Sequence, residues 1–161
     1  MAAGERRRGE IYSAPLDWIG CIGTGMDFQA YNKGIIEEFR ANGGKVGGVF
    51  EGAKLLLLTT TGAKSGLSRT NPLVFLEDKG RYVIVASYAG APTNPPWFYN
   101  LKANPQVIVE IGTERFTGEA EVLQEPERSR LYQKMVEVMP GFAEYQKKTT
   151  RVIPVIALRR R

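Results

Sequence analysis

Apolar residues near the start of the chain recur at intervals of three and four, which is the spacing of one face of a helix. The residues on that face are Phe28, Tyr31, Ile35 and Phe39. They predict an amphipathic helix over residues 27–41, and the sequence Asn42-Gly43-Gly44 provides its C-terminal stop. We expect this helix to pack on a protein core; docking on a membrane or on a partner is the alternative.

The middle and the end of the chain carry short apolar runs separated by turn residues, a pattern typical of strands. Six strands are predicted, over residues 54–61, 69–76, 82–86, 106–111, 114–123 and 152–158. Pro72 lies inside the second of them. Because proline cannot donate a hydrogen bond to a sheet, we expect this strand at a sheet edge or at a bulge.

Helical patterns return in three shorter segments, at residues 97–103, 125–138 and 142–147. The strands follow one another mostly through hairpins and do not alternate regularly with helices, so a parallel sheet is disfavoured. We predict an α+β fold in which a mostly antiparallel sheet curls into a small barrel with helices outside. The 161 residues suit one compact domain, which we place at residues 26–161 after a flexible N-terminal segment over 1–25.

The composition excludes several kinds of active site. The chain has no histidine, a single cysteine and three isolated aspartates. Without histidine there is no Ser-His-Asp or Cys-His nucleophile system and no histidine-ligated metal, and one cysteine cannot form an internal disulfide. We expect no metal site. If the chain is an enzyme, we expect a bound organic cofactor to carry its chemistry.

The net charge is +5, and the excess of positive charge lies at the two ends of the chain. Without Glu5 and the arginines at 6–8 and 159–161, basic and acidic residues are equal in number. A nucleic-acid groove needs cations on the folded body, so we expect two solvated tails and no nucleic-acid partner. No secretory signal or membrane-spanning run is visible, which predicts a cytoplasmic protein. Contact of the basic termini and the first helix with the inner face of a membrane is a further hypothesis.

Residues 59–72 combine glycines, hydroxyl groups and cations. Between residues 52 and 76 there is no acid, and the three cations are Lys54, Lys64 and Arg69. The backbone N–H groups of a glycine-bounded turn can hold an anion, and the hydroxyls of Ser65 and Ser68 add donors. Arginine can bind a phosphate or a carboxylate through two parallel bonds. This segment predicts an anion site; a solvated hairpin turn with surface cations is the alternative.

Three groups of residues together resemble a known family. They are the run T-T-x-G-x-K-S-G-x-x-R-x-N-P at 59–72, a strand ending in Ala86-Ser87, and the run N-P-x-W-x-x-N-L-x-A-N-P at 94–105. Their order and spacing are similar to those of the deazaflavin-dependent nitroreductases and F420H2-dependent quinone reductases of actinobacteria. The resemblance covers about residues 27–158. It implies a split β-barrel and reduced coenzyme F420 as the cofactor.

The resemblance also implies which residues bind the cofactor. They are Ala63, Lys64, Ser65, Gly66, Arg69, Asn71, Pro72, Ala86, Ser87, Tyr88, Pro96, Trp97 and Asn100. Lys64, Ser65, Gly66 and Arg69 would hold the phosphate and the oligoglutamate tail. Residues 86–88 would line the deazaflavin, with the Ser87 hydroxyl near its reacting face. For Trp97 core packing is the alternative, and for Asn100 it is capping of a helix end.

Two parts of the implied site depart from the family pattern. The family often has a basic residue where Ala63 stands and a lysine where Tyr88 stands, so we expect a weaker grip on the tail. It also places tyrosines in the substrate pocket where this chain has Met139, Phe142 and Tyr145. These residues imply a pocket for flat, apolar acceptors; a simple apolar helix stripe is the alternative.

The resemblance thus implies an oxidoreductase that transfers a hydride from reduced F420 to an electron-poor acceptor. The acceptor classes are quinones, activated enones or lactones, and nitroaromatics. Ser87 and Tyr145 are the candidate catalytic residues, as proton donors in competition with solvent. The alternatives are an FMN-binding oxidoreductase of the same fold and a non-catalytic carrier of a cofactor or lipid. The oligomeric state is left open.

Overall fold

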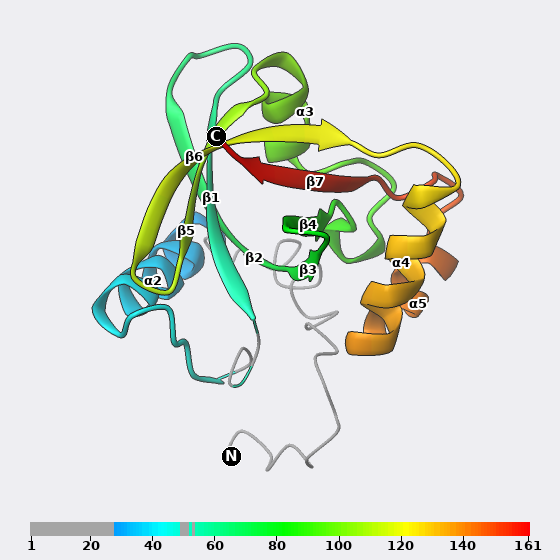
Figure 1. The fold of residues 1–161 in the computed structure, drawn as a ribbon, viewed down its shortest axis with the longest axis horizontal. Coiled ribbons are helices and arrows are strands. Elements are labelled where there is room, and N and C mark those ends of the chain that lie inside the picture. The colour runs from blue at the N-terminus through cyan, green and yellow to red at the C-terminus, as the bar shows by residue number, and fades with distance from the viewer. Residues whose placement is uncertain (1–27, 49–51, 53) are drawn as a thin grey trace.

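The computed structural model describes residues 28–48, 52 and 54–161, so the N-terminal segment expected over 1–25 lies outside the described residues. The strands are β1 (Leu55–Thr61), β2 (Ser68–Val74), β3 (Leu76–Asp78), β4 (Arg81–Val85), β5 (Gln106–Ile111), β6 (Glu114–Val122) and β7 (Val155–Arg160). The helices are α2 (Phe28–Ala41), α3 (Pro96–Ala103), α4 (Glu127–Val138) and α5 (Gly141–Lys147), with a 3-10 turn, η2 (Tyr88–Gly90). Helix α2 flanks β1 and β5, whereas α4 and α5 lie together beyond the start of β7 (Figure 1). None of the described helices is long and apolar enough to span a membrane.

The sheet is curled because its two edges are almost continuous in the chain. Its strand order is β2-β1-β5-β6-β7-β4-β3, and all neighbouring pairs are antiparallel. Strands β2 and β3 are the two edges, yet only Phe75 separates them in sequence. One residue cannot bridge the width of a flat sheet, so the edges approach each other and the sheet forms a half-barrel. The predicted antiparallel barrel is confirmed.

The strand predicted over residues 69–76 is two strands in the structure, so the prediction of six strands is one too few. The Phe75 N–H still donates to the Lys54 carbonyl beside β1 (3.1 Å), but Leu76 already pairs with Val83 of β4. A two-residue turn at Lys79 and Gly80, with φ of 51° and 76°, then joins β3 to β4. A three-residue strand carries no periodic signal. The edge position expected from Pro72 is confirmed for β2.

The leucine run in β1 is buried on both faces of the sheet. Leu56 and Leu58 belong to a buried cluster with Trp97 and Leu101 of α3. The alternate residues, Leu55 and Leu57, pack with Ile35 and Phe39 of α2. Each leucine buried in this way stabilises the fold by about 1.5–3 kcal/mol. The core-packing prediction for the first helix is therefore confirmed.

The third buried cluster fixes α4 and α5 to the sheet. Helix α4 contributes Leu131 and Met135, and these pack with Val85 of β4 and Val155 of β7. Phe142 of α5 belongs to the same cluster. The two helices therefore share one core with the end of β4, where the chain leads into η2.

The expectation of a solvated basic tail at the C-terminus is wrong. Arg159 and Arg160 belong to β7, which pairs with β6 along this stretch. Three glutamates of β6 neutralise the terminal arginines, through the pairs Arg159–Glu121 (2.8 Å), Arg160–Glu114 (2.6 Å) and Arg161–Glu119 (3.8 Å). Such exposed pairs contribute about 1 kcal/mol or less each. The arginines at 6–8 lie outside the described residues.

Candidate functional site

The turn between β1 and β2 has a closed shape held by its own backbone. The Gly62 N–H donates to the Leu67 carbonyl (2.8 Å), and the Gly66 N–H donates to the Gly62 carbonyl (2.9 Å). The Ser65 hydroxyl accepts from the Leu67 N–H (3.2 Å). A β-carbon on Gly62 would lie 2.5 Å from that hydroxyl oxygen, and Gly66 has a φ of +71°. The glycines are therefore required by the turn itself.

This turn and the start of β2, residues 62–69, are here called the basic turn, and their positive charge is not neutralised. Lys64 and Arg69 are exposed. Neither side chain forms an ion pair or a hydrogen bond with any residue that the structure describes. Lys54, also exposed, has no such partner either. Lys54 lies at the opposite end of β1, so the positive surface of the basic turn is formed by Lys64 and Arg69, two cations without acids that attract an anion.

Asn100 of α3 holds the basic turn in place. Its side-chain carbonyl accepts from the Ala63 N–H (3.0 Å), and its amide donates to the Thr60 hydroxyl (3.2 Å). Both functional groups of this side chain are thus used within the protein. The side chain of Asn100 thus acts on the turn and not on the helix end, where the Asn100 backbone carbonyl accepts the ordinary last-turn bond from the Asn104 N–H.

A hollow of about 270 Å³ lies beside the basic turn. It is lined by Thr59, Thr60, Thr61, Ser68, Asn104, Gln106, Val107 and Ile108. Hydroxyl and amide groups dominate this lining, and the Thr59 and Thr70 hydroxyls bond to each other across the strands (2.8 Å). On the edge strand, Arg69 and Asn71 share one face because side chains alternate along a strand. The surface next to the turn thus suits a polar ligand.

The chain after β4, residues 86–90, has an unusual backbone and is here called the 86–90 segment. Ala86 and Ser87 are buried. Ser87 is in the right-handed helical region (φ −71°, ψ −35°), and Tyr88 follows with a φ of +47°. A tyrosine in the left-handed region is strained, and such strain is typical of functional sites.

Three polar groups of the 86–90 segment have no hydrogen-bond partner in the part of the chain that the structure describes. The Ser87 hydroxyl, the Ser87 N–H and the Tyr88 N–H make no hydrogen bond to any other described residue. Buried donors are normally paired in proteins. Successive N–H groups in a right-handed then left-handed backbone form a concave, electropositive surface. The segment therefore offers donors to a carbonyl or an anionic oxygen.

Arg151 contacts the 86–90 segment from the connection between α5 and β7, and sequence reasoning missed it. Its guanidinium donates to the backbone carbonyls of Ala86, Ser87 and Ala91 and to the side-chain carbonyl of Asn94. The stretch 145–161 contains no acid, but this signal is shared by Lys147, Lys148 and the three terminal arginines and does not single out Arg151.

The three residues expected to line an acceptor pocket are buried in the core shared by α4 and α5. Met139 is 1% exposed, Phe142 7% and Tyr145 2%. The rings of Phe142 and Tyr145 meet edge to face, with centroids 5.3 Å apart. Burial raises the pKa of the Tyr145 phenol to about 12, so this group keeps its proton at neutral pH. Tyr145 also touches the 86–90 segment, because a β-carbon on Gly90 would lie 2.9 Å from its carbonyl oxygen.

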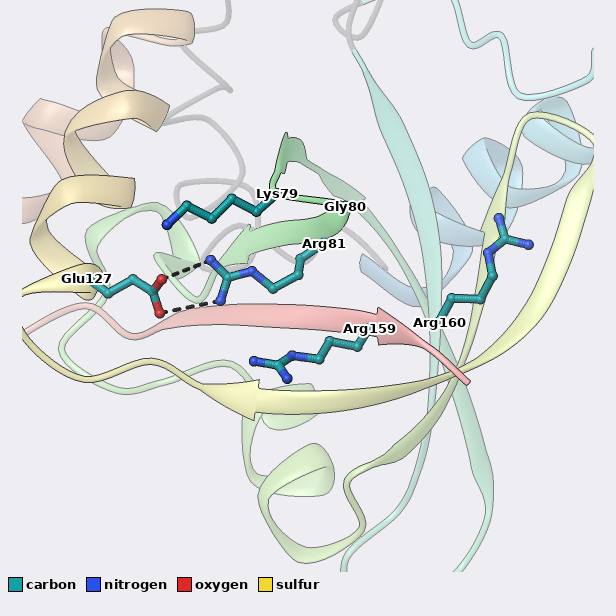
Figure 2. Close-up of a pocket in the computed structure, with 6 residues that line it drawn as sticks. All are labelled: Lys79, Gly80, Arg81, Glu127, Arg159 and Arg160. Atoms are coloured by element: carbon teal, nitrogen blue, oxygen red, sulfur yellow. Dashed lines mark hydrogen bonds and ion pairs between the residues drawn. The ribbon is translucent and has the colours of Figure 1, made fainter.

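A larger hollow, of about 500 Å³, lies elsewhere and contains none of the predicted site residues. It is lined by Lys79, Gly80, Arg81, Glu127, Arg159 and Arg160 (Figure 2). Arg81 forms two hydrogen bonds with Glu127 (2.9 and 3.3 Å), drawn as dashed lines in Figure 2. Arg159 and Arg160 pair with the glutamates named above. Its arginines are all paired with acids, so Lys79 is the one cation of this lining without an ion pair among the described residues.

The structure brings most of the predicted residues into two connected groups. Ala63 and Asn100 are hydrogen-bonded, which joins the basic turn to α3. Trp97 of α3 and Ala86 belong to the same buried cluster, which joins α3 to the 86–90 segment. Trp97 is 6% exposed, so most of its surface is used in core packing. Tyr145 reaches this assembly through Gly90, while Met139 and Phe142 lie deeper in the core.

Comparison with known proteins gives a separate line of information. Residues 33–160 match the family model described as F420H(2)-dependent quinone reductase. An F420H2-dependent quinone reductase of Mycobacterium tuberculosis (strain H37Rv) is 42% identical over 127 residues, which are 76% of this chain and 85% of that protein. The family match extends from within α2 to the end of β7 and includes both the basic turn and the 86–90 segment.

Two solved structures share the fold. One, described as an F420-H2 dependent reductase, is 44% identical, with a TM-score of 0.61, and covers 65% of this chain and 93% of its own. The other, described as a domain-swapped dimer, is 36% identical, with a TM-score of 0.62, and covers 89% of this chain and 98% of its own.

Proposed function

This chain belongs to the F420H2-dependent quinone reductase family, and on that premise we propose that the basic turn and the 86–90 segment together bind its cofactor. The chain is an oxidoreductase that uses reduced coenzyme F420 and a small-molecule acceptor. The family does not favour the FMN-binding enzyme or the non-catalytic carrier. We further propose that the acceptor of this chain is a quinone.

When bound, reduced F420 supplies the hydride; the residues of this chain bind, orient and exclude water. The donor set fits such a cofactor. Lys64 and Arg69 offer charge without an internal partner, which suits a phosphate and a tail of carboxylates. The free N–H groups of Ser87 and Tyr88 suit the oxygens of a flat ring system.

The basic turn supplies most of the proposed affinity for the tail. A hydrogen bond to a charged group contributes about 1.5–3 kcal/mol, and each 1.4 kcal/mol is about a factor of ten in Kd. The internal bonds of the turn and its bonds to Asn100 fix the backbone before the ligand arrives. Preorganisation of this kind lowers the entropy cost of binding. Asn100 therefore contributes to affinity through the turn.

The 86–90 segment is the proposed wall for the ring. Ala86 is fully buried against the cluster that contains Trp97, so the wall is rigid from behind. The Ser87 hydroxyl has no partner in the described chain and is one group that can hold a proton beside the ring. We propose Ser87 as a binding residue and as one proton donor.

The apolar residues of the α4–α5 region suit a quinone, which is flat and largely apolar. Phe142 and Tyr145 pack edge to face, and the backbone of Tyr145 lies next to the 86–90 segment at Gly90. The raised pKa of Tyr145 keeps its phenol neutral, so it can hold a proton and places no negative charge beside an electron-rich product. We propose that Met139, Phe142 and Tyr145 support the acceptor side of the site.

Contact with an anionic membrane surface stays a prediction that rests on the N-terminal end. The arginines at 6–8 lie outside the described residues, and the C-terminal arginines are engaged by glutamates. Sedimentation with phosphatidylglycerol vesicles, compared between the chain and a variant with serine at positions 6–8, tests it. Equal sedimentation of the two proteins would rule it out.

The proposed cofactor site rests chiefly on two cations of a preformed turn, Lys64 and Arg69, which have no acidic partner among the described residues. It is tested by fluorescence titration with F420 and, in parallel, with FMN. We expect binding of F420 in the micromolar range or tighter, and a Kd raised about tenfold or more in Lys64→Ala and in Arg69→Ala.

Arg115→Ala is the matched control, because Arg115 is exposed, has no ion pair among the described residues and lies at the opposite end of β5 and β6. It should leave the Kd unchanged. Tight binding of FMN without binding of F420 would overturn the cofactor assignment. Binding of F420 without reduction of any quinone by the reduced cofactor would overturn the proposed acceptor.

A further inference from the structure

The guanidinium of Arg151 is surrounded by neutral oxygen atoms. Its Nε donates to the Ala91 carbonyl (2.9 Å), and its Nη2 donates to the Ser87 carbonyl (2.8 Å). Its Nη1 donates to the Asn94 side-chain carbonyl (2.7 Å) and to the Ala86 carbonyl (3.3 Å). One side chain thus holds four oxygens of residues 86–94.

No carboxylate neutralises this charge. Arg151 takes part in none of the ion pairs of the described chain, and the other titratable groups that influence it are the phenols of Tyr99 and Tyr132. Burial lowers its pKa, whereas the buried Arg81 pairs with Asp78 and Glu127. A desolvated guanidinium without a counter-ion is costly, so packing alone does not explain it.

The carbonyls that Arg151 holds belong to the same peptide groups as the unpartnered N–H groups. In a trans peptide the C=O and N–H bonds point in opposite directions. The peptide between Ala86 and Ser87 therefore has its oxygen on Arg151 and the Ser87 N–H on the other side. The next peptide is arranged in the same way and directs the Tyr88 N–H away from Arg151.

The backbone angles add curvature to this arrangement. Ser87 is right-handed and Tyr88 left-handed, the combination that brings successive N–H groups together around one point. A cation on the carbonyl side of a peptide also polarises it, which makes the N–H a stronger donor. The two N–H groups thus have a positive charge directly behind them.

We infer that Arg151 is a positioning residue of the cofactor site, which shapes the 86–90 segment and places a positive charge behind the Ser87 and Tyr88 N–H groups, so that they bind a ring oxygen carrying negative charge. The inference rests on the proposed function. It assigns to the α5–β7 connection a part in cofactor binding. The basic turn then holds the anionic tail, and Arg151 favours the anionic form of the ring.

The test separates the charge of Arg151 from its packing. Arg151→Lys keeps the charge and Arg151→Gln removes it. Arg128→Gln is the structural control, because Arg128 is also half-buried and donates to the Ile153 carbonyl (2.8 and 3.0 Å) without touching residues 86–94. The readouts are the Kd of F420 by fluorescence and the pKa of the bound deazaflavin hydroxyl, followed by visible absorbance.

We expect Arg151→Gln to raise the Kd about tenfold and the pKa of the bound chromophore, since a lost positive charge disfavours the anion. The Kd of Arg151→Lys should stay within about threefold of the value for the unmodified chain. Arg128→Gln should have the same Kd and the same chromophore pKa as the unmodified chain. Equal values for Arg151→Lys and Arg151→Gln would overturn the inference, as would an Arg128→Gln effect as large as that of Arg151→Gln. Failure of the unmodified chain to bind F420 would instead overturn the proposed function.

Discussion

The α-carbon of Gly90 lies so close to α5 that a β-carbon there would be 2.9 Å from the carbonyl oxygen of Tyr145. The same β-carbon would be 3.0 Å from Cβ of Lys148. The backbone of the 86–90 segment therefore rests on the backbone of α5, the helix that carries two of the proposed acceptor residues, Phe142 and Tyr145. Because neither backbone can yield, a shift of one element displaces the other.

Gly90→Ala should therefore disturb both stability and binding. Gly90 has a φ of +83°, so alanine adds left-handed strain to the clash, and we expect a loss of about 3 kcal/mol in the free energy of unfolding. Gly80→Ala is the control: Gly80 has a φ of +76° but open space around it, and should lose about 1 kcal/mol. Urea denaturation measures the free energy of unfolding of both variants, and fluorescence titration with F420 measures their binding. Equal losses would show that the contact with Tyr145 has no energetic weight.

Asn100→Ala should weaken F420 binding from a distance. The substitution removes the two bonds that hold Ala63 and Thr60, so we expect a loss of about 1–2 kcal/mol in stability and a Kd for F420 raised about tenfold. Lys102→Ala, an exposed change on the same helix, should leave the Kd unaltered. Fluorescence titration and thermal unfolding provide the two measurements. An unchanged Kd in Asn100→Ala would mean that the turn keeps its shape without α3.

The stability of the chain should fall in acid through Asp78. Hydrogen bonds from Arg130, Lys134 and Arg81 hold the pKa of this buried carboxyl well below its usual range. A lowered folded pKa stabilises the protein above the unfolded pKa, and the contribution is lost as the pH falls through the folded value.

At neutral pH, Asp78→Asn should lower the free energy of unfolding by about 2–3 kcal/mol. The difference from the unmodified chain should shrink as the pH drops below about 4. Urea denaturation across pH measures it, with Glu77→Gln as the exposed neighbour that should show neither effect. A difference independent of pH would indicate lost packing instead of lost charge.

Tyr145 should contribute no ionisation to the pH profile of catalysis. Its pKa is raised to about 12 by burial, so the phenol remains protonated throughout the range of an ordinary assay. Tyr145→Phe should change the rate of quinone reduction without changing the shape of its profile between about pH 6 and 9. An alkaline limb that disappears in Tyr145→Phe would contradict this assignment.

Local patterns predicted the secondary structure well where they were long. The apolar stripe of α2 includes the buried Ile35 and Phe39, and α4, expected over residues 125–138, spans Glu127–Val138. The final strand was harder. It was expected over residues 152–158 but runs over Val155–Arg160, because the pairing of its arginines with β6 extends it beyond its apolar residues.

The site was predictable as far as its motifs are local. The basic turn is contiguous in sequence, so its glycines and cations indicate an anion site without knowledge of the fold. Arg151 is separated in sequence from its hydrogen-bond partners by 57 to 65 positions, and no periodic pattern connects it to them. The strained φ of Tyr88 and the contact of Gly90 with α5 depend on tertiary packing, which local patterns do not encode.

Strand β7 also has a consequence for how the protein is made. Both of its partners, β4 and β6, precede it in the chain, and without it the described sheet divides into β2-β1-β5-β6 and β4-β3. During synthesis the edges of β6 and β4 that face β7 stay unpaired until residues 155–160 have left the ribosome. Folding of the barrel is therefore completed late and over long sequence separations, which makes it slow. The interval before β7 arrives is when an emerging chain is most exposed to pairing with a neighbouring one.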